Sequence, residues 1–210
     1  MTNKVLVIMS SVISEDKSYS TALWKRFVKH YKVVNPDDEI IYLDLNKEEM
    51  AQKTLTRQNF DKYFNEEDTN KYVNQLKSVN KIIVSSQMMN FNIPGILKNY
   101  IDHVWVANQT FSYKYSKKGD AVGLLDPEYR HDGIKEKVKV QILATQGAPL
   151  GWYPWGDHVG YLKGTFEFIG CKVMVPLLVD GTKIPQNSKK TPEARIDEYD
   201  EKIKSLVKMF

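Results

Sequence analysis

Short polar loops that follow apolar runs hold the residues of this chain best suited to chemistry. After K-I-I-V-S-S the sequence continues Q-M-M-N-F-N-I-P-G, where Met88, Met89, Asn90 and Phe91 join sulfur, amide and aromatic side chains. Apolar side chains beside exposed backbone N–H groups suit a flat heteroaromatic ring whose polar edge those groups can read. An ordinary connection with buried Met and Phe explains the segment equally well, so both interpretations stay open at this point.

A second loop, residues 10–20, reads S-S-V-I-S-E-D-K-S-Y-S and runs into a predicted helix. Hydroxyls and free N–H groups at a helix N-terminus can bind a phosphate. A serine N-cap after a flexible loop explains the same pattern. Because neither the P-loop motif nor a G-x-G-x-x-G fingerprint is present, a phosphate-binding loop of this kind favours a mononucleotide.

A third loop, residues 144–157, reads A-T-Q-G-A-P-L-G-W-Y-P-W-G-D. Gly147 allows a ring to approach the backbone closely, and Trp152, Tyr153 and Trp155 add stacking surface. The same aromatic residues are equally expected from packing or from an interface. If the three loops meet at one edge of a sheet, they can hold one flat ligand with a phosphate tail.

Strands that alternate with helices must position these loops. Apolar, β-branched runs and one more amphipathic run predict the strands Lys4–Ser10, Glu39–Leu45, Lys81–Ser86, Val138–Thr145 and Lys172–Val179. Helical spacing of apolar residues predicts the helices Ser20–Tyr31, Glu66–Val79, Pro94–Ala107, Val159–Ile169 and Thr191–Met209. This alternation indicates parallel βαβ units, and ligands bind outside the carboxyl ends of the strands of such sheets.

Five strands and five helices in 210 residues predict a flavodoxin-like α/β fold. We expect a five-stranded parallel sheet in the order 2-1-3-4-5 with helices on both faces, formed by residues 1–210 as a single domain. Residues 46–65 and 108–137 are longer than connections need. The second stretch contains T-F-S-Y-K-Y and G-D-A-V-G-L-L, which can pair as a short hairpin over the site.

Composition narrows the class of protein. Thirty Lys and Arg against 26 Asp and Glu give a net charge of +4 spread along the chain, which indicates a solvated surface rather than a nucleic-acid site. No run approaches 18 apolar residues, so we predict no membrane insertion, and the amino-terminal residues do not match a signal peptide. The single cysteine, Cys171, excludes an intrachain disulfide, fits a reducing, cytoplasmic compartment and is expected in the core.

No side chain is predicted to act as a catalytic base, a nucleophile or a metal ligand. The four histidines do not have zinc-ligand spacing, and G-x-S-x-G is absent. We expect His30 and His131 at the surface. His103 lies in a predicted helix and His158 in the Trp-rich loop, and either is a candidate to assist protonation of an acceptor.

Four segments carry a family resemblance in order along nearly the whole chain. They are K-V-L-V-I-M-S-S with a later S-Y-S, M-N-F-N-I-P-G-I-L-K-N-Y-I-D-H-V, T-F-S-Y and T-F-E-F-I-G-C. The chain thereby resembles the FMN-dependent NADH azoreductases, also called NADH:quinone oxidoreductases. This resemblance implies a homodimer with one non-covalent FMN per subunit, which oxidises NADH and reduces quinones and azo dyes in a two-electron ping-pong cycle.

The resemblance also implies three groups of FMN-binding residues. The group implied for the phosphate and ribityl chain is Ser10, Ser18, Tyr19 and Ser20. The groups implied for the isoalloxazine ring are Met88, Met89, Asn90 and Phe91, and Thr145, Gln146, Gly147 and Ala148. The chain departs from the family pattern in four ways: the serine loop is one residue longer, Gln87 replaces a proline, the third loop reads Thr145–Gln146–Gly147–Ala148 where the family often has Ser-x-Gly-Gly, and its Trp-rich continuation is extended.

The main alternative is a flavodoxin-type electron carrier, which passes electrons to a protein partner and does not oxidise NADH. Such carriers are usually acidic and shorter, so the net charge of +4 and the added loops count against this class. A mononucleotide-binding protein that holds no flavin is a third possibility. A bound chromophore would exclude the third class, and direct oxidation of NADH would separate the first two.

Overall fold

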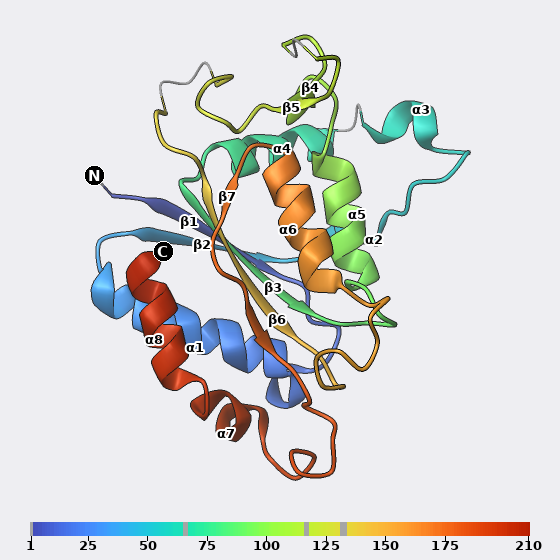
Figure 1. Cartoon of the computed structure of the whole chain (residues 1–210). Coiled ribbons are helices and arrows are strands. Elements are labelled where there is room, and N and C mark those ends of the chain that lie inside the picture. Colours follow the sequence, from blue (N-terminus) through green and yellow to red (C-terminus); the bar gives the residue numbers. More distant parts are fainter. Residues whose placement is uncertain (1, 65–66, 116–117, 131–133) are drawn as a thin grey trace.

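The computed structural model describes residues 2–64, 67–115, 118–130 and 134–210. Its centre is a parallel sheet in the order β2-β1-β3-β6-β7, in which β8 also pairs with β6 (Figure 1). The strands are β1 (Lys4–Met9), β2 (Glu39–Asp44), β3 (Lys81–Gln87), β6 (Lys139–Thr145), β7 (Lys172–Val173) and β8 (Leu177–Val179). The central strands are buried on both faces, as their continuous apolar, β-branched sequences require.

The last expected strand, Lys172–Val179, is two short strands, so the sheet has six strands rather than five. Pro176 lies between them and has no N–H to donate to the ladder. A side-chain hydrogen bond replaces the ladder at this point: the Nε2 of buried Gln141 donates to the Val175 carbonyl at 2.9 Å. Both β7 and β8 pair with β6, so together they occupy the edge position expected for the fifth strand. The order of the predicted strands in the sheet is therefore the expected 2-1-3-4-5.

Helices cover both faces of the sheet because side chains alternate between the faces of a strand. Leu6 and Ile8 of β1 pack toward one helical layer, and Val5 and Val7 pack toward the other. Figure 1 shows the two helical layers on either side of the sheet. The first layer contains α2 (Glu49–Gln52), α4 (Glu67–Lys77), α5 (Gly95–Val104) and α6 (His158–Phe168), and the second contains α1 (Tyr19–Val34), α7 (Pro192–Asp197) and α8 (Asp200–Met209). Cys171 is buried in the first layer's core, as expected.

The connections contain short elements. The serine loop contains a turn of 3-10 helix, η1 (Glu15–Lys17), and the long connections contain α3 (Phe60–Tyr63) and the strands β4 (Phe111–Ser112) and β5 (Val122–Gly123). The two strands pair antiparallel, so the expected hairpin forms. Its expected position over the site is wrong. The Leu125 N–H donates to the Ile169 carbonyl at 2.9 Å, where α6 has ended, so the hairpin lies at the amino end of the sheet (Figure 1).

A buried ion pair lies at that amino end, on the face covered by α1. Lys81 is 8% exposed, and its Nζ donates to the Tyr31 hydroxyl at 2.8 Å and lies 3.9 Å from Asp38 Oδ2. The Tyr31 hydroxyl donates in turn to the Asp38 carboxylate. Burial lowers the pKa of Lys81, and the nearby Asp38 carboxylate opposes that shift.

We expect Asp38→Ala to lower the free energy of unfolding by about 3–5 kcal/mol, because it leaves the Lys81 ammonium buried without its counter-charge. Urea unfolding at neutral pH measures the change. The control is the double variant Asp38→Ala with Lys81→Met, which removes both charges and should regain part of the loss. If the single and double variants are equally unstable, the two charges are not coupled.

Candidate functional site

The pairing of β3 with β6 brings the sequence-predicted loops to one edge of the sheet. Gln87 lies opposite Thr145 in the parallel register. The ladder continues one residue further, because the Met88 N–H donates to the Thr145 carbonyl at 2.8 Å and the Gln146 N–H donates to the Val179 carbonyl at 3.0 Å. The loops therefore leave the sheet from fixed positions.

A cavity of about 350 Å³ lies where these loops meet, a size within the range of small-molecule sites. Eight of the predicted site residues line it: Ser18, Tyr19, Ser20, Met88, Met89, Thr145, Gln146 and Gly147. Sequence reasoning missed five others, which are Ile13, Lys17, Gln87, Thr182 and Lys183. The last two follow the carboxyl end of β8, so the rule that pointed to the other loops also points to them.

One end of this cavity is polar and lies at the start of α1. Ser18 caps the helix, because its Oγ accepts from the Thr21 N–H at 3.1 Å. The Ser18 hydroxyl also contacts those of Ser11 at 2.7 Å and Ser20 at 3.1 Å. Ser18 therefore acts first as an N-cap. The other N–H groups of the first turn and the exposed cations Lys17 and Lys183 give this end of the cavity the chemistry that suits an anion.

Ser10 is not brought to the cavity. It is fully buried, and its hydroxyl donates to the Ser85 carbonyl at 2.8 Å, which ties the end of β1 to β3. Ala148 also stays outside the lining, where its carbonyl accepts from Gln146 Nε2 at 3.0 Å. The structure gives both residues a supporting position, and a direct contact with a ligand stays a prediction for each.

Asn90 and Phe91 form a strained turn at the rim rather than the wall of the cavity. Met89 and Asn92 exchange backbone hydrogen bonds of 2.7 and 3.0 Å, and the two residues between them have φ values of 45° and 69°. Positive φ at both central positions is the requirement of a type I′ turn, which usually contains Gly or Asn. A phenylalanine there is costly, and such strain concentrates at functional sites.

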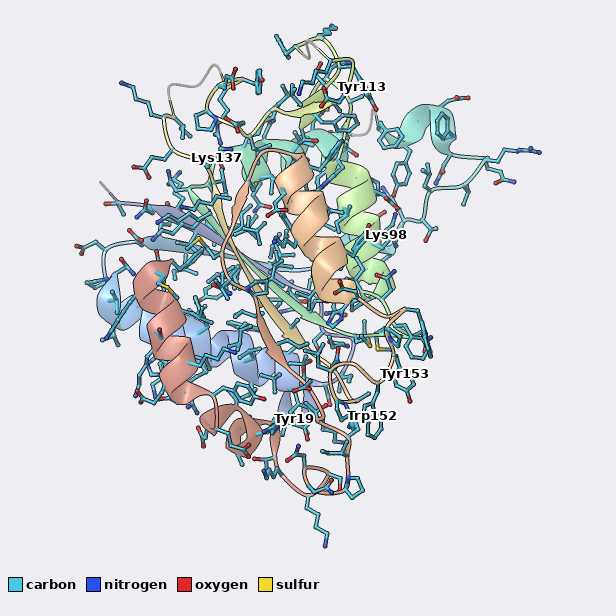
Figure 2. The ribbon with its side chains drawn as sticks, in the orientation of Figure 1. Tyr19, Lys98, Tyr113, Lys137, Trp152 and Tyr153 are labelled. Carbon is cyan, nitrogen blue, oxygen red and sulfur yellow. The ribbon has the colours of Figure 1, made fainter. Side chains whose placement is uncertain are left out.

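An exposed aromatic cluster surrounds this turn. The Phe91 ring lies 5.2 Å from that of Tyr153 and 5.8 Å from that of Trp155. These three residues are 43%, 39% and 68% exposed, and Trp152 beside them is 61% exposed. Figure 2 shows Tyr19, Trp152 and Tyr153 at the same end of the molecule, opposite Tyr113 and Lys137. Large aromatic surface therefore stands next to the cavity.

A second hollow of about 260 Å³ adjoins the first and shares Met88 and Gln146 with it. Residues of the Trp-rich loop, including Tyr153 and Asp157, form the rest of its wall. The two hollows therefore adjoin at Met88 and Gln146. The long third loop thus forms part of the site rather than an unrelated insertion.

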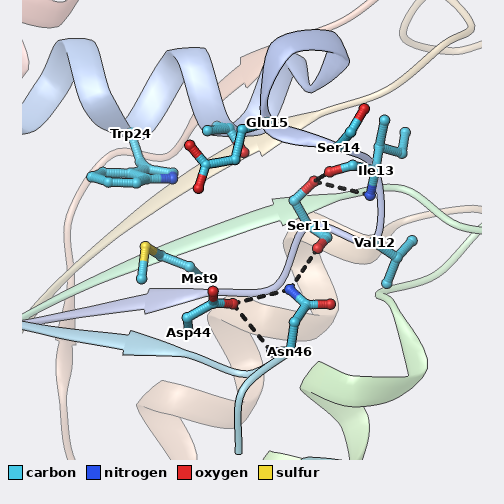
Figure 3. Close-up of a pocket in the computed structure, with 10 residues that line it drawn as sticks. Met9, Ser11, Val12, Ile13, Ser14, Glu15, Trp24, Asp44 and Asn46 are labelled. Atoms are coloured by element: carbon cyan, nitrogen blue, oxygen red, sulfur yellow. Dashed lines mark hydrogen bonds between the residues drawn. The ribbon is translucent and has the colours of Figure 1, made fainter.

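A third hollow, of about 290 Å³, lies behind the serine loop (Figure 3). The carboxylates of Glu15 and Asp44 line it, which makes it unsuited to a phosphate. Asn46 Nδ2 donates to the Ser11 carbonyl at 2.8 Å and to Asp44 Oδ1 at 3.0 Å. These bonds tie the serine loop to the end of β2.

Neither candidate histidine lines the cavities at this edge. His103 is fully buried, with its ring stacked 4.0 Å from that of Tyr63. His158 is 1% exposed, and burial lowers its pKa to about 4, so its ring is neutral near pH 7. His30 contacts Asp200 at 2.7 Å, and His131 lies outside the described residues.

Within the residues that the structure describes, no group of three or more His, Cys, Asp and Glu side chains is arranged to hold a metal ion. None of their helices combines the length and apolar character needed to cross a membrane.

The sheet order, the two helical layers and the cavity at the carboxyl edge define a flavodoxin-like protein, and a family model described as a flavodoxin-like fold matches residues 3–203. The chain is 56% identical to the FMN-dependent NADH:quinone oxidoreductase of Malacoplasma penetrans, over 99% of this chain and 93% of that protein. It is 51% identical to FMN-dependent NADH:quinone oxidoreductase 1 of Mesoplasma florum, over 99% and 100%. The chain belongs to the family of FMN-dependent NADH:quinone oxidoreductases, which confirms the family predicted from the motifs.

A solved structure supports the fold independently. The azoreductase from Bacillus anthracis superposes with a TM-score of 0.79 and is 24% identical, with 100% of both chains covered. Such a match at low identity shows that the whole chain follows the arrangement of that protein.

The Phe91 turn gives a test of the strain at the rim. Phe91→Gly and Phe91→Ala both remove the ring, but only glycine adopts a φ near 69° without a steric penalty. We expect the Gly variant to be more stable than the Ala variant by about 1 kcal/mol, measured by chemical denaturation. Equal stabilities would mean that the turn is not left-handed in solution.

Proposed function

We propose that this chain binds one FMN per subunit, non-covalently, in the cavity at the carboxyl edge. The observation that carries the proposal is the polarity of that cavity. The start of α1 with Lys17 and Lys183 forms a cationic end, and Met88 and Met89 form an apolar end. A phosphate tail fits the first end and a flat ring fits the second. The names of the two relatives, which specify FMN and NADH, support the same assignment.

The proposed activity is oxidation of NADH coupled to reduction of quinones and azo compounds. The relatives' names support quinones as acceptors, and the resemblance of the motifs supports azo compounds. When bound, the flavin would supply two-electron redox chemistry between donor and acceptor. The protein's own residues hold the ring, exclude water and leave one side of it reachable through the second hollow beside Met88 and Gln146.

Because one hollow serves both small molecules, donor and acceptor occupy it in turn. The neutral, buried ring of His158 and the stacked ring of His103 support a cycle without a histidine acid. In the proposed cycle, the described side chains therefore bind and orient the cofactor and the substrates, and none of them forms a covalent bond. The family-model match over residues 3–203 supports one FMN-binding domain over residues 1–210, and buried, free Cys171 is compatible with a reducing, cytoplasmic setting.

We expect the purified protein to show flavin absorbance and to release FMN on denaturation. NADH alone should bleach the absorbance, and a quinone or azo dye should restore it. Double-reciprocal plots at several fixed acceptor concentrations should give parallel lines, as a ping-pong cycle requires. A flavin that only a reductase protein can bleach would favour the electron carrier, and a protein without a chromophore after incubation with FMN would favour the flavin-free class.

We also propose that the chain forms a homodimer through the exposed aromatic surface beside the cavity, with the partner helping to enclose the flavin. Trp152, Trp155 and Leu150 are 61%, 68% and 73% exposed, and aromatic residues in such number are typical of interface cores. The neighbouring second hollow would then lie at the edge of the interface.

Trp152→Glu combined with Trp155→Glu should give a monomer in sedimentation and weaken FMN binding by tenfold or more, because the charges oppose burial of this surface. Phe60→Glu is a matched control, since Phe60 is 58% exposed but lies on α3. A native protein that is monomeric and turns over NADH fully would refute the dimer.

A further inference from the structure

Gln87, the last residue of β3, has a buried amide that the rest of the chain satisfies only in part. The residue is 6% exposed and lines the main cavity. Its Oε1 accepts a hydrogen bond from Ser20 Oγ at 3.1 Å. Its Nε2 is buried and has no hydrogen-bond partner among the described residues. Buried N–H groups are nearly always paired, so an acceptor for this group should come from the ligand.

The direction of the side chain follows from the alternation along β3. Ile83 belongs to the core on the α1 face, so Ser85 and Gln87 point to the same face. Ser85 Oγ accordingly donates to the Ser20 carbonyl at 3.1 Å. Gln87 thus lies beneath the first turn of α1, at the polar end of the cavity rather than against the apolar end formed by Met88 and Met89.

Hydrogen bonds fix the amide in this place. The hydroxyls of Ser11, Ser18 and Ser20 form a chain of contacts of 2.7 and 3.1 Å, and the last hydroxyl donates to Gln87 Oε1. This series of hydroxyl contacts joins the serine loop and the cap of α1 to the end of β3. A ligand that meets Gln87 Nε2 is therefore held by a group whose position is set by the serine loop and the first turn of α1.

We propose that Gln87 Nε2 donates a hydrogen bond to an oxygen of the flavin's ribityl phosphate tail. The inference rests on the proposed function, because it assumes a flavin in this cavity. It assigns Gln87 the role of a tail-binding residue and leaves the ring to the loops around Met88 and Gln146.

The stability of the flavin-free protein should depend on the unpaired Gln87 N–H group. Without the ligand, the unpaired N–H destabilises the fold, so an apolar residue of similar size should not lower stability. The same residue should weaken binding of the cofactor. Gln87→Leu is therefore expected to keep or raise the melting temperature of the flavin-free chain while it raises the Kd for FMN at least tenfold. A residue with only a structural role would lose stability and affinity together.

The experiment compares flavin-free full-length native protein, Gln87→Leu and Gln87→Glu by titration with FMN and with lumiflavin, which has the ring but no tail. Quenching of flavin fluorescence gives each Kd. We expect Gln87→Leu to leave the Kd for lumiflavin within twofold. Gln87→Glu should weaken FMN binding more than Gln87→Leu does, because a carboxylate accepts only and repels the phosphate.

Gln75→Leu is the matched control, because Gln75 lies on α4 away from the cavity and also has a buried amide oxygen without a partner among the described residues. It should leave both Kd values unchanged. Equal weakening of FMN and lumiflavin by Gln87→Leu, no weakening, or full FMN affinity in Gln87→Glu would each overturn the inference while the proposed function stands. A native protein that binds no flavin would overturn both.

Discussion

The site depends on the parallel register of β1, β3 and β6. Ser85 pairs with Met9 on one side and Leu143 on the other, so the three strands reach their carboxyl ends at one level. Side chains alternate with a period of two, and a slip of one residue would move Gln87 away from α1 and its contact with Ser20. The register of the sheet therefore sets the geometry of the cavity, because it fixes the points at which the loops leave β1, β3 and β6.

The need to align the strand ends explains why the loop of residues 10–20 is rich in serine although not every serine hydroxyl faces the cavity. Ser10 ties β1 to β3, and Ser18 caps α1, so their hydroxyls are engaged within the protein. These hydrogen bonds position the backbone N–H groups of the first helical turn, which form the proposed phosphate-binding end of the cavity. Lysines from separate loops, Lys17 and Lys183, add charge at long range without needing close geometry.

Sequence reasoning could predict the strands and the loops they present, because β-branched runs and their order determine a parallel sheet. It could not predict the turn at Phe91, since M-N-F-N contains no glycine to indicate two positive φ values. The hairpin's position was decided by a tertiary contact with Ile169, which no local pattern encodes. The position of Gln87 follows from the alternation Ile83, Ser85, Gln87, which places it on the α1 face, but the family pattern marks it only as a replacement for proline.

The interruption at Pro176 has a consequence for how copies of this protein can associate. An open sheet edge invites another strand to add to it, and long regular edges lead to aggregation. Here the edge beyond β6 is divided into segments of two and three residues, Lys172–Val173 and Leu177–Val179. Pro176 offers no N–H, and Val175 already accepts from Gln141. Extension of the sheet from one molecule to the next is therefore disfavoured at this edge.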